Sequence, residues 1–106
     1  MTRTELIQKI IDEKGFKKYL EIGTYKGESF FPINCKFKVA VDPQFNIPIK
    51  RKVKWVVKNA NNLFNRYFEQ TSDDFFNKHK KFVSNFKPQV VFVDGLHTFK
   101  ASLMDV

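Results

Sequence analysis

Residues that could bind a ligand follow three apolar segments of this chain. Gly23 and Gly27 follow the first segment, Asp42 ends the second, and Asp94 ends the last. Glycine lets the backbone approach a ligand closely, and amides at the start of a helix can bind an anionic group. A carboxylate at the end of the next strand can accept hydrogen bonds from both hydroxyls of a ribose. These residue types predict a site for a nucleoside-like ligand.

The spacing of the glycines separates two classes of ligand. A dinucleotide fingerprint needs Gly-x-Gly-x-x-Gly, but Thr24 and Tyr25 stand where the second glycine would be needed. The bulk of Tyr25 disfavours a pyrophosphate, and the chain has no Gly-Lys-Ser/Thr phosphate loop. Glu21 and Asp94 add negative charge, which suits a cationic ligand. The spacing therefore favours a nucleoside without phosphates, and a nicotinamide-dependent enzyme stays as a weaker hypothesis.

Alternating strands and helices are expected to bring these residues together. The predicted strands are 18–22, 37–41, 66–70 and 90–93, and the last is an uninterrupted apolar run typical of a strand covered on both faces. Such alternation predicts an α/β fold: a Rossmann-like, doubly wound parallel sheet with helices on both faces. In such a sheet the carboxyl ends of the strands meet at one crevice, where ligands bind.

Helices are expected between and around these strands. Thr2 or Thr4 can cap a helix over 4–14 that Gly15 ends, and Thr71 or Ser72 can cap one that runs to Phe86. A short helix is expected over 28–31, and another is expected to begin at Leu96. The stretch 44–54 reads as an irregular connection because it holds Pro48 and a basic run, and 55–57 is ambiguous between strand and helix.

Composition limits the class of protein. The 106 residues allow one domain, and 42% hydrophobic residues with 13 phenylalanines supply a core. The net charge of +8 suits nucleic acid or another anionic partner, although the basic runs 50–52 and 78–81 are expected to be solvated. Cys35 is the only cysteine and is expected to be a small buried hydrophobe; His79 falls on an apolar helix stripe and is expected to be a core or boundary histidine. The absence of an apolar leader or spanning run predicts a cytoplasmic chain without a membrane partner.

Four motifs in order resemble those of one enzyme family. The segments are LEIGTYKGES at 20–29, VAVDP at 39–43, FEQTSDDFF at 68–76 and FVDGLHTF at 92–99. Together they resemble class I S-adenosylmethionine-dependent methyltransferases, in particular a small-molecule and glycan-type subgroup with an Asp-Gly-x-His motif. The resemblance begins near Tyr19 and covers most of the chain.

This resemblance implies a role for each matching position. The cofactor S-adenosylmethionine would be bound at its methionine part by the first-motif residues, at its ribose by the second-strand acid and near its adenine by the third segment. Asp94 and His97 would stand near the methyl donor and acceptor, with His97 as the base that takes the acceptor's proton. No metal site is expected within the chain. The implied cofactor-binding residues are Glu21, Gly23, Thr24, Gly27, Asp42, Ser72, Asp73 and Asp94.

The family's sheet has more strands than this chain supplies. Residues 1–106 therefore read as one partial domain, truncated after about four strands, whose open edge beside the fourth strand would favour self-association. The expected acceptor is an oxygen or nitrogen of a small molecule or glycan. A non-enzymatic module that binds nucleic acid or another anionic partner through its positive charge stays as the alternative.

Overall fold

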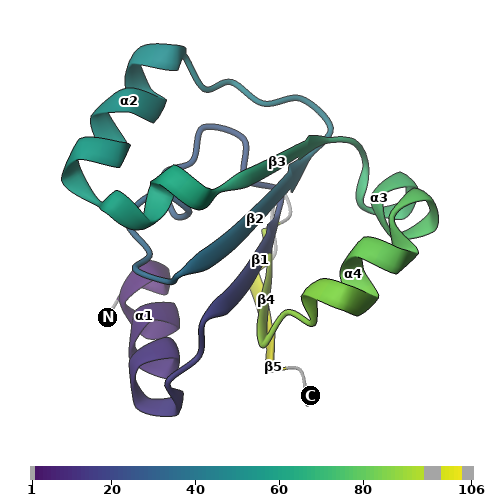
Figure 1. The fold of residues 1–106 in the computed structure, drawn as a ribbon, viewed down its shortest axis with the longest axis horizontal. Coiled ribbons are helices and arrows are strands. Elements are labelled where there is room, and N and C mark those ends of the chain that lie inside the picture. The colour runs from purple at the N-terminus through teal and green to yellow at the C-terminus, as the bar shows by residue number, and fades with distance from the viewer. Residues whose placement is uncertain (1, 95–98, 104–106) are drawn as a thin grey trace.

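The fold is built on one twisted sheet with helices on both of its faces (Figure 1). The structure, a computed structural model, describes residues 2–94 and 99–103. These residues form five strands in the order β3-β2-β1-β4-β5. Neighbours among β1 to β4 run parallel, and β5 runs antiparallel to β4. The strands are β1 (Lys18–Ile22), β2 (Phe37–Asp42), β3 (Arg66–Glu69), β4 (Val90–Asp94) and β5 (Phe99–Leu103).

The parallel sheet confirms the expected α/β class and is consistent with a Rossmann-like fold. Side chains alternate across each strand, so Tyr19 and Ala40 join one core while Leu20 and Val41 join the other. The first core lies under α1 (Arg3–Lys14) and α2 (Ile49–Lys58). The second lies under α3 (Ser72–Lys78) and α4 (Lys80–Phe86). Figure 1 shows these two pairs of helices on opposite sides of the sheet.

Helix α1 forms as its sequence predicts. The hydroxyl of Thr2 accepts the backbone N–H of Glu5 at 3.1 Å, which satisfies one free amide of the first turn. Gly15 ends the helix at φ 66°, a left-handed conformation that favours glycine. Ile7 and Ile11 lie on the buried face, one helical turn apart.

Helix α2 corrects the prediction of an irregular connection over 49–54, whereas residues 44–48 are irregular as expected. Pro48 does not interrupt a helix here; it immediately precedes Ile49, where its fixed φ is compatible with a helix start. Trp55 anchors the helix by stacking on Phe31, with ring centroids 6.1 Å apart. A short 3-10 helix, η1 (Ala60–Phe64), follows. The tertiary contact of Trp55 thus settles the ambiguity that the local sequence leaves open.

Three other predicted helices differ from the structure. The single helix expected up to Phe86 is broken at His79 into α3 and α4. The helix expected over 28–31 is reduced to turns, with one helical hydrogen bond from the N–H of Phe31 to the carbonyl of Gly27 at 3.0 Å before Pro32. Residues 99–103 form β5 instead of a helix, because a strand there pairs with the backbone of β4 that would otherwise be an edge. The predicted open edge beside β4 is therefore wrong within the described residues.

No helix in the described part of the chain is long and apolar enough to cross a membrane.

Candidate functional site

The turn after β1 is held in an unusual backbone conformation. Gly23, Tyr25 and Gly27 all have positive φ, at 86°, 49° and 79°. The N–H of Gly23 donates to the carbonyl of Val41 at 2.8 Å, so β1 stays paired with β2 up to the bend. The N–H of Gly27 then donates to the carbonyl of Thr24 at 2.9 Å and closes a tight turn. Alternating positive φ values turn the backbone sharply where a ligand can approach it.

Asp42 fastens this turn to the end of β2. One carboxylate oxygen accepts the N–H of Tyr25 at 3.0 Å, and the other accepts the N–H of Gln44 at 2.8 Å. The side chain is 7% exposed, so these charge-assisted bonds lie away from bulk water. Asp42 thereby stabilises the left-handed conformation of Tyr25, which is unfavourable for a residue with a side chain.

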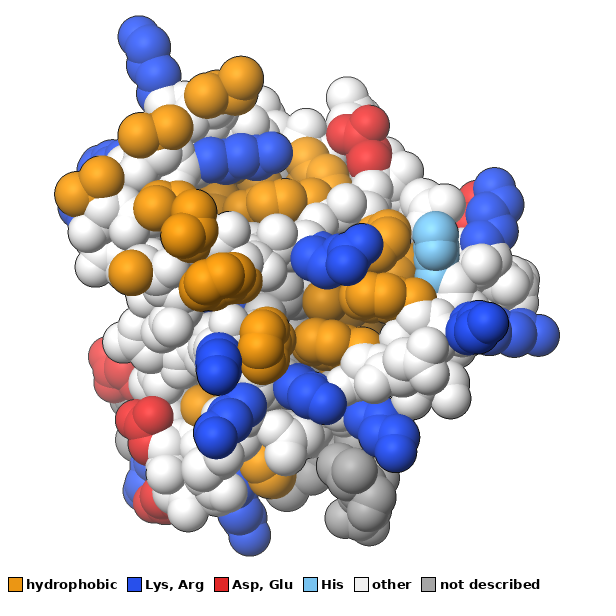
Figure 2. All heavy atoms as spheres, viewed as in Figure 1, with side chains coloured by type: hydrophobic (Ala, Val, Ile, Leu, Met, Phe, Trp, Pro, Cys, Tyr) orange, Lys and Arg blue, Asp and Glu red, His pale blue; other side chains and the backbone are white. Residues whose placement is uncertain are grey.

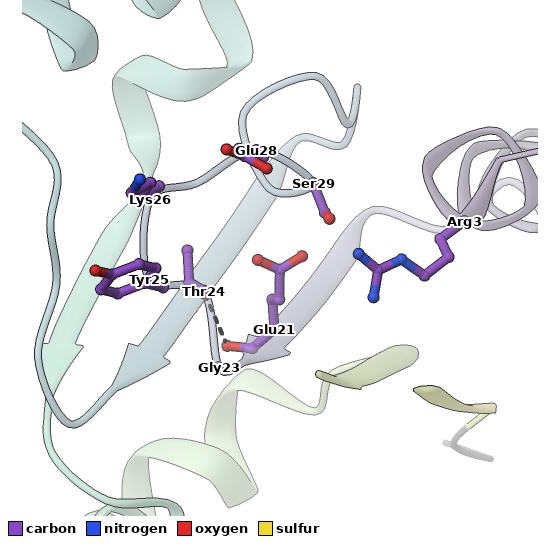
Figure 3. Close-up of a pocket in the computed structure, with 8 residues that line it drawn as sticks. All are labelled: Arg3, Glu21, Gly23, Thr24, Tyr25, Lys26, Glu28 and Ser29. Carbon is purple, nitrogen blue, oxygen red and sulfur yellow. Dashed lines mark hydrogen bonds between the residues drawn. The ribbon is translucent and has the colours of Figure 1, made fainter. Parts of the chain in front are cut away.

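A pocket of about 280 Å³ lies beside this turn (Figure 3). Its volume is just below the range of about 300–1,000 Å³ that is typical of small-molecule sites. Figure 3 shows the carboxylate of Glu21 and the guanidinium of Arg3 pointing toward each other across it, while the ring of Tyr25 points away. The lining residues are Arg3, Glu21, Gly23, Thr24, Tyr25, Lys26, Glu28 and Ser29.

The pocket lies where open α/β sheets bind ligands. It sits at the carboxyl end of β1, and β1 has β2 on one side and β4 on the other. The chain therefore leaves β1 in one direction and later returns to its other side, which makes this the topological switch point.

Glu21 points into the pocket from β1 and is 1% exposed; the hydroxyl of Tyr19 donates to it at 2.7 Å.

The lining mixes charges of both signs. Glu21 and Glu28 are acidic, and Arg3 and Lys26 are basic. Such a lining can bind a ligand that itself carries an ammonium and a carboxylate, because each charge meets its opposite.

The chain matches no family model, no curated protein and no solved structure.

The structure brings together only part of the set of residues predicted from sequence. Glu21, Gly23 and Thr24 line the pocket, whereas Gly27 and Asp42 are not among its lining residues: Asp42 binds the N–H of Tyr25, and Gly27 packs against Phe31. The other lining residues were not among the predicted site residues: Arg3, Tyr25, Lys26, Glu28 and Ser29. Arg3 carries no local signal, since it precedes the motif by a whole helix and reaches the site only through the packing of α1.

Gly27 has a packing role that its spacing does not reveal. A Cβ at this position would lie 2.4 Å from Cε2 and 2.6 Å from Cδ2 of Phe31. That ring is 1% exposed and is packed against Phe30 and Trp55. Glycine is therefore required here by the aromatic core as well as by its φ of 79°.

The other predicted residues lie outside the pocket lining or outside the described residues. Ser72 and Asp73 begin α3, directly beyond β3, at the same carboxyl end of the sheet; Ser72 is half-buried and Asp73 is exposed. The backbone of Asp94 ends β4. His97, the predicted base, lies outside the described residues.

A buried lysine on β2 is the main feature that the motifs did not identify. Lys38 is 1% exposed, and its ammonium donates to the carbonyls of Phe30 at 2.7 Å and Ile33 at 2.9 Å. Burial lowers the pKa of Lys38 from 10.5 to about 7, and the charge of Glu21 opposes that change. A lysine inside an otherwise apolar central strand is the sequence signal that could have revealed it.

Lys38 helps to fix the segment that leads away from the pocket. Asn59 and Asn62 also donate to carbonyls of this segment, at distances between 3.0 and 3.1 Å. The polar cluster holds residues 30–33 in place beneath α2 and η1. The cluster therefore fixes the segment that directly follows Ser29, the last lining residue along the chain.

Two predictions about single side chains are confirmed. Cys35 is 3% exposed, and burial raises the pKa of its thiol, which makes it a poor nucleophile. His79 lies at the edge of the second core, with its ring 4.9 Å from that of Phe68 and 5.5 Å from that of Phe75.

Proposed function

We propose that this chain binds S-adenosylmethionine as the cofactor-binding part of a class I methyltransferase-like domain. The observation that carries the proposal is the mixed-charge pocket at the switch point of the sheet, formed by Glu21 and the glycine turn. The amino-acid end of the cofactor carries an ammonium and a carboxylate, which match this lining. The motif resemblance supports the same assignment.

The residues of the chain would bind and orient the cofactor. Glu21 and the backbone after Gly23 would hold its methionine part. Asp42 would hold the ribose, because each of its oxygens accepts one backbone N–H and a carboxylate oxygen has capacity for a second bond. Ser72 and Asp73 would lie toward the adenine. The pocket of about 280 Å³ would hold part of the cofactor in this proposal, and the nucleoside end would extend toward these residues.

Methyl transfer needs alignment more than covalent work by the protein. When bound, the cofactor supplies a methyl group that its sulfonium has already activated. The protein then has to hold an acceptor oxygen or nitrogen in line with that group. In this proposal Asp94 positions the acceptor, and His97 takes its proton, at a small molecule or glycan.

Calorimetric titration with S-adenosylmethionine and S-adenosylhomocysteine tests the proposal. Both are expected to bind and to raise the melting temperature of the chain. Ser29→Tyr places a large side chain in the pocket and is expected to weaken binding at least about tenfold, the scale of steric exclusion from a built site. Ser84→Tyr, on the exposed face of α4, is the matched control and should bind as the parent does.

Two results would refute the proposal. One is the absence of both heat and thermal stabilisation with either ligand. The other is binding that Ser29→Tyr leaves unchanged, which would put the ligand elsewhere. Binding of a nicotinamide dinucleotide in place of both adenosyl ligands would assign the switch-point pocket to the other cofactor class.

A second candidate function, nucleic-acid binding, has one observation in its favour. A hollow of about 300 Å³ at the amino end of β2 has Phe37, Phe64 and Phe86 in its lining together with Lys18 and Arg66. Aromatic and basic side chains in one groove suit a single-stranded nucleic acid. Oligonucleotide binding that falls steeply with salt and is weakened by Arg66→Ala would support this function, and no binding at low salt would remove it.

A further inference from the structure

Helix α2 turns its most apolar side toward solvent. Ile49, Val53 and Val57 are 78%, 58% and 82% exposed. Residues four apart lie on the same face of a helix, so these three form one continuous row, the outer stripe. An amphipathic helix on a globular protein normally buries such a row against the core. Here Trp55 makes the inward contact instead, by stacking on Phe31.

A row of lysines runs beside the outer stripe. Lys50, Lys54 and Lys58 follow the stripe residues by one position each and are all exposed. The helix contains no acid, and the whole stretch 43–68 holds six basic residues and no Asp or Glu. That stretch therefore supplies six of the eight net positive charges of the chain. Three of these six charges, those of Lys50, Lys54 and Lys58, lie beside the apolar row.

The start of α2 also favours a negatively charged neighbour. The N-terminus of a helix carries partial positive charge, and acids in the first turn normally stabilise it. The first turn of α2 has none and instead contains Lys50 and Arg51, and Pro48 at the cap makes no side-chain hydrogen bond. The like charges at this end cost stability that an anionic surface would relieve.

The apolar surface continues onto η1, which packs against α2. Leu63 and Phe64 are 66% and 59% exposed. Figure 2 shows hydrophobic side chains gathered over α2 and η1 with Lys and Arg side chains beside them, while the acidic groups in view lie elsewhere. Apolar and cationic groups thus share one exposed face.

We propose that α2 docks this chain on an anionic phospholipid surface, with the outer stripe among the acyl chains and the lysine row at the lipid phosphates. A helix with an apolar face, a basic face and low overall hydrophobicity lies in the plane of such an interface. A nucleic acid offers phosphates but no apolar interior for Ile49, Val53 and Val57. A bilayer surface offers both phosphates and an apolar interior within the width of one helix. This proposal replaces two expectations from the sequence: that the basic run 50–52 is simply solvated, and that the chain has no membrane partner.

Binding to vesicles measures the proposal directly. Vesicles of phosphatidylcholine with phosphatidylserine are compared with vesicles of phosphatidylcholine alone, by co-sedimentation and by energy transfer from Trp55 to a dansyl-labelled lipid. Trp55 is the only tryptophan and lies on α2, so its signal reports on this helix. The chain is expected to bind the anionic vesicles and to lose that binding as salt rises.

Two α2 variants and one control separate the apolar and charged contributions. Lys50→Gln with Lys54→Gln is expected to lower the partition coefficient about 25-fold, because each basic side chain near an anionic bilayer contributes about fivefold. Ile49→Ser with Val57→Ser removes apolar surface and is expected to lower it about tenfold or more. Lys78→Gln with Lys81→Gln removes the same charge from the other side of the sheet and should leave it within about threefold of the parent value.

These variants change exposed side chains, and unchanged circular dichroism and denaturation midpoints would confirm that each is folded. The proposal is overturned if the parent chain shows no preference for anionic vesicles or if both α2 variants bind as the parent does. Oligonucleotide binding that depends on the lysine row, without vesicle binding, would assign the face to nucleic acid and overturn it too. Self-association in the absence of lipid that Ile49→Ser with Val57→Ser abolishes would assign the face to a second copy of the chain and overturn the lipid proposal as well.

Discussion

Replacement of Gly27 by alanine tests whether packing against the aromatic core requires glycine at this position of the turn. The new Cβ would lie 2.4 and 2.6 Å from two ring carbons of Phe31, well inside van der Waals contact. The ring has little room to move away, since it stacks on Trp55 with an interplanar angle of 9° and meets Phe30 edge-on. Relief of the clash would therefore disturb both the first core and the turn beside the pocket.

Gly15→Ala gives the matched control for this change. Both glycines have positive φ, 66° at Gly15 and 79° at Gly27, but a Cβ at Gly15 would meet nothing within 4 Å. Gly15→Ala thus carries only the backbone cost of about 1–2 kcal/mol. Gly27→Ala carries that cost plus about 1–3 kcal/mol for overpacking. The expected losses in the free energy of unfolding are about 1–2 kcal/mol and about 2–5 kcal/mol respectively.

Urea denaturation followed by circular dichroism measures both losses under the same conditions. Circular dichroism is preferred because Trp55 touches Phe31 and its fluorescence could change without unfolding. If Gly27→Ala costs no more than Gly15→Ala, within about 0.5 kcal/mol, then the contact with Phe31 does not constrain the turn and the packing argument is wrong.

Two further predictions concern the buried polar groups around the turn. Asp42→Ala leaves the N–H groups of Tyr25 and Gln44 without their carboxylate, and we expect it to lower the free energy of unfolding by about 2–4 kcal/mol in urea denaturation. The exposed Asp12→Ala is the control and should lower it by about 0.5 kcal/mol or less. Equal losses for the two variants would contradict the anchoring role of Asp42. Burial lowers the pKa of Lys38 to about 7, so between about pH 7 and pH 10 the unfolded chain binds this proton more tightly than the folded chain. The free energy of unfolding should therefore rise across that interval, and Lys38→Met should flatten the rise; a parent curve that falls, or a variant curve that matches the parent, would count against the assignment.

Several parts of the fold could be predicted from local patterns. The alternation of apolar segments with helices identified β1, β2, β3 and β4 within about one residue, Gly15 marked the end of α1, and its cap was narrowed to Thr2 or Thr4. These features follow from local rules: side-chain hydrogen bonds at a helix start, the left-handed freedom of glycine, and the burial of continuous apolar strands. The glycines and acids at strand ends likewise indicated which edge of the sheet carries the site.

Other elements depend on contacts between distant residues. Residues 49–58 form a helix whose Trp55 stacks on Phe31, and residues 99–103 form a strand that pairs with β4. Neither contact can be predicted from the neighbouring sequence, because the partner residues are distant along the chain. The same holds for the break at His79, where the ring packs against Phe68 on β3.

The sequence by itself determined the α/β class, the order of the first four strands along the chain and the residue types at their carboxyl ends. Only the tertiary structure decided which of those residues line the pocket and which instead hold the turn beside it. Arg3 reaches the pocket through the packing of α1, Asp42 binds the turn, and Gly27 makes room for Phe31. The physical reason is that hydrogen-bonding capacity and backbone freedom belong to single residues, whereas proximity and burial are set by the packing of segments remote in sequence.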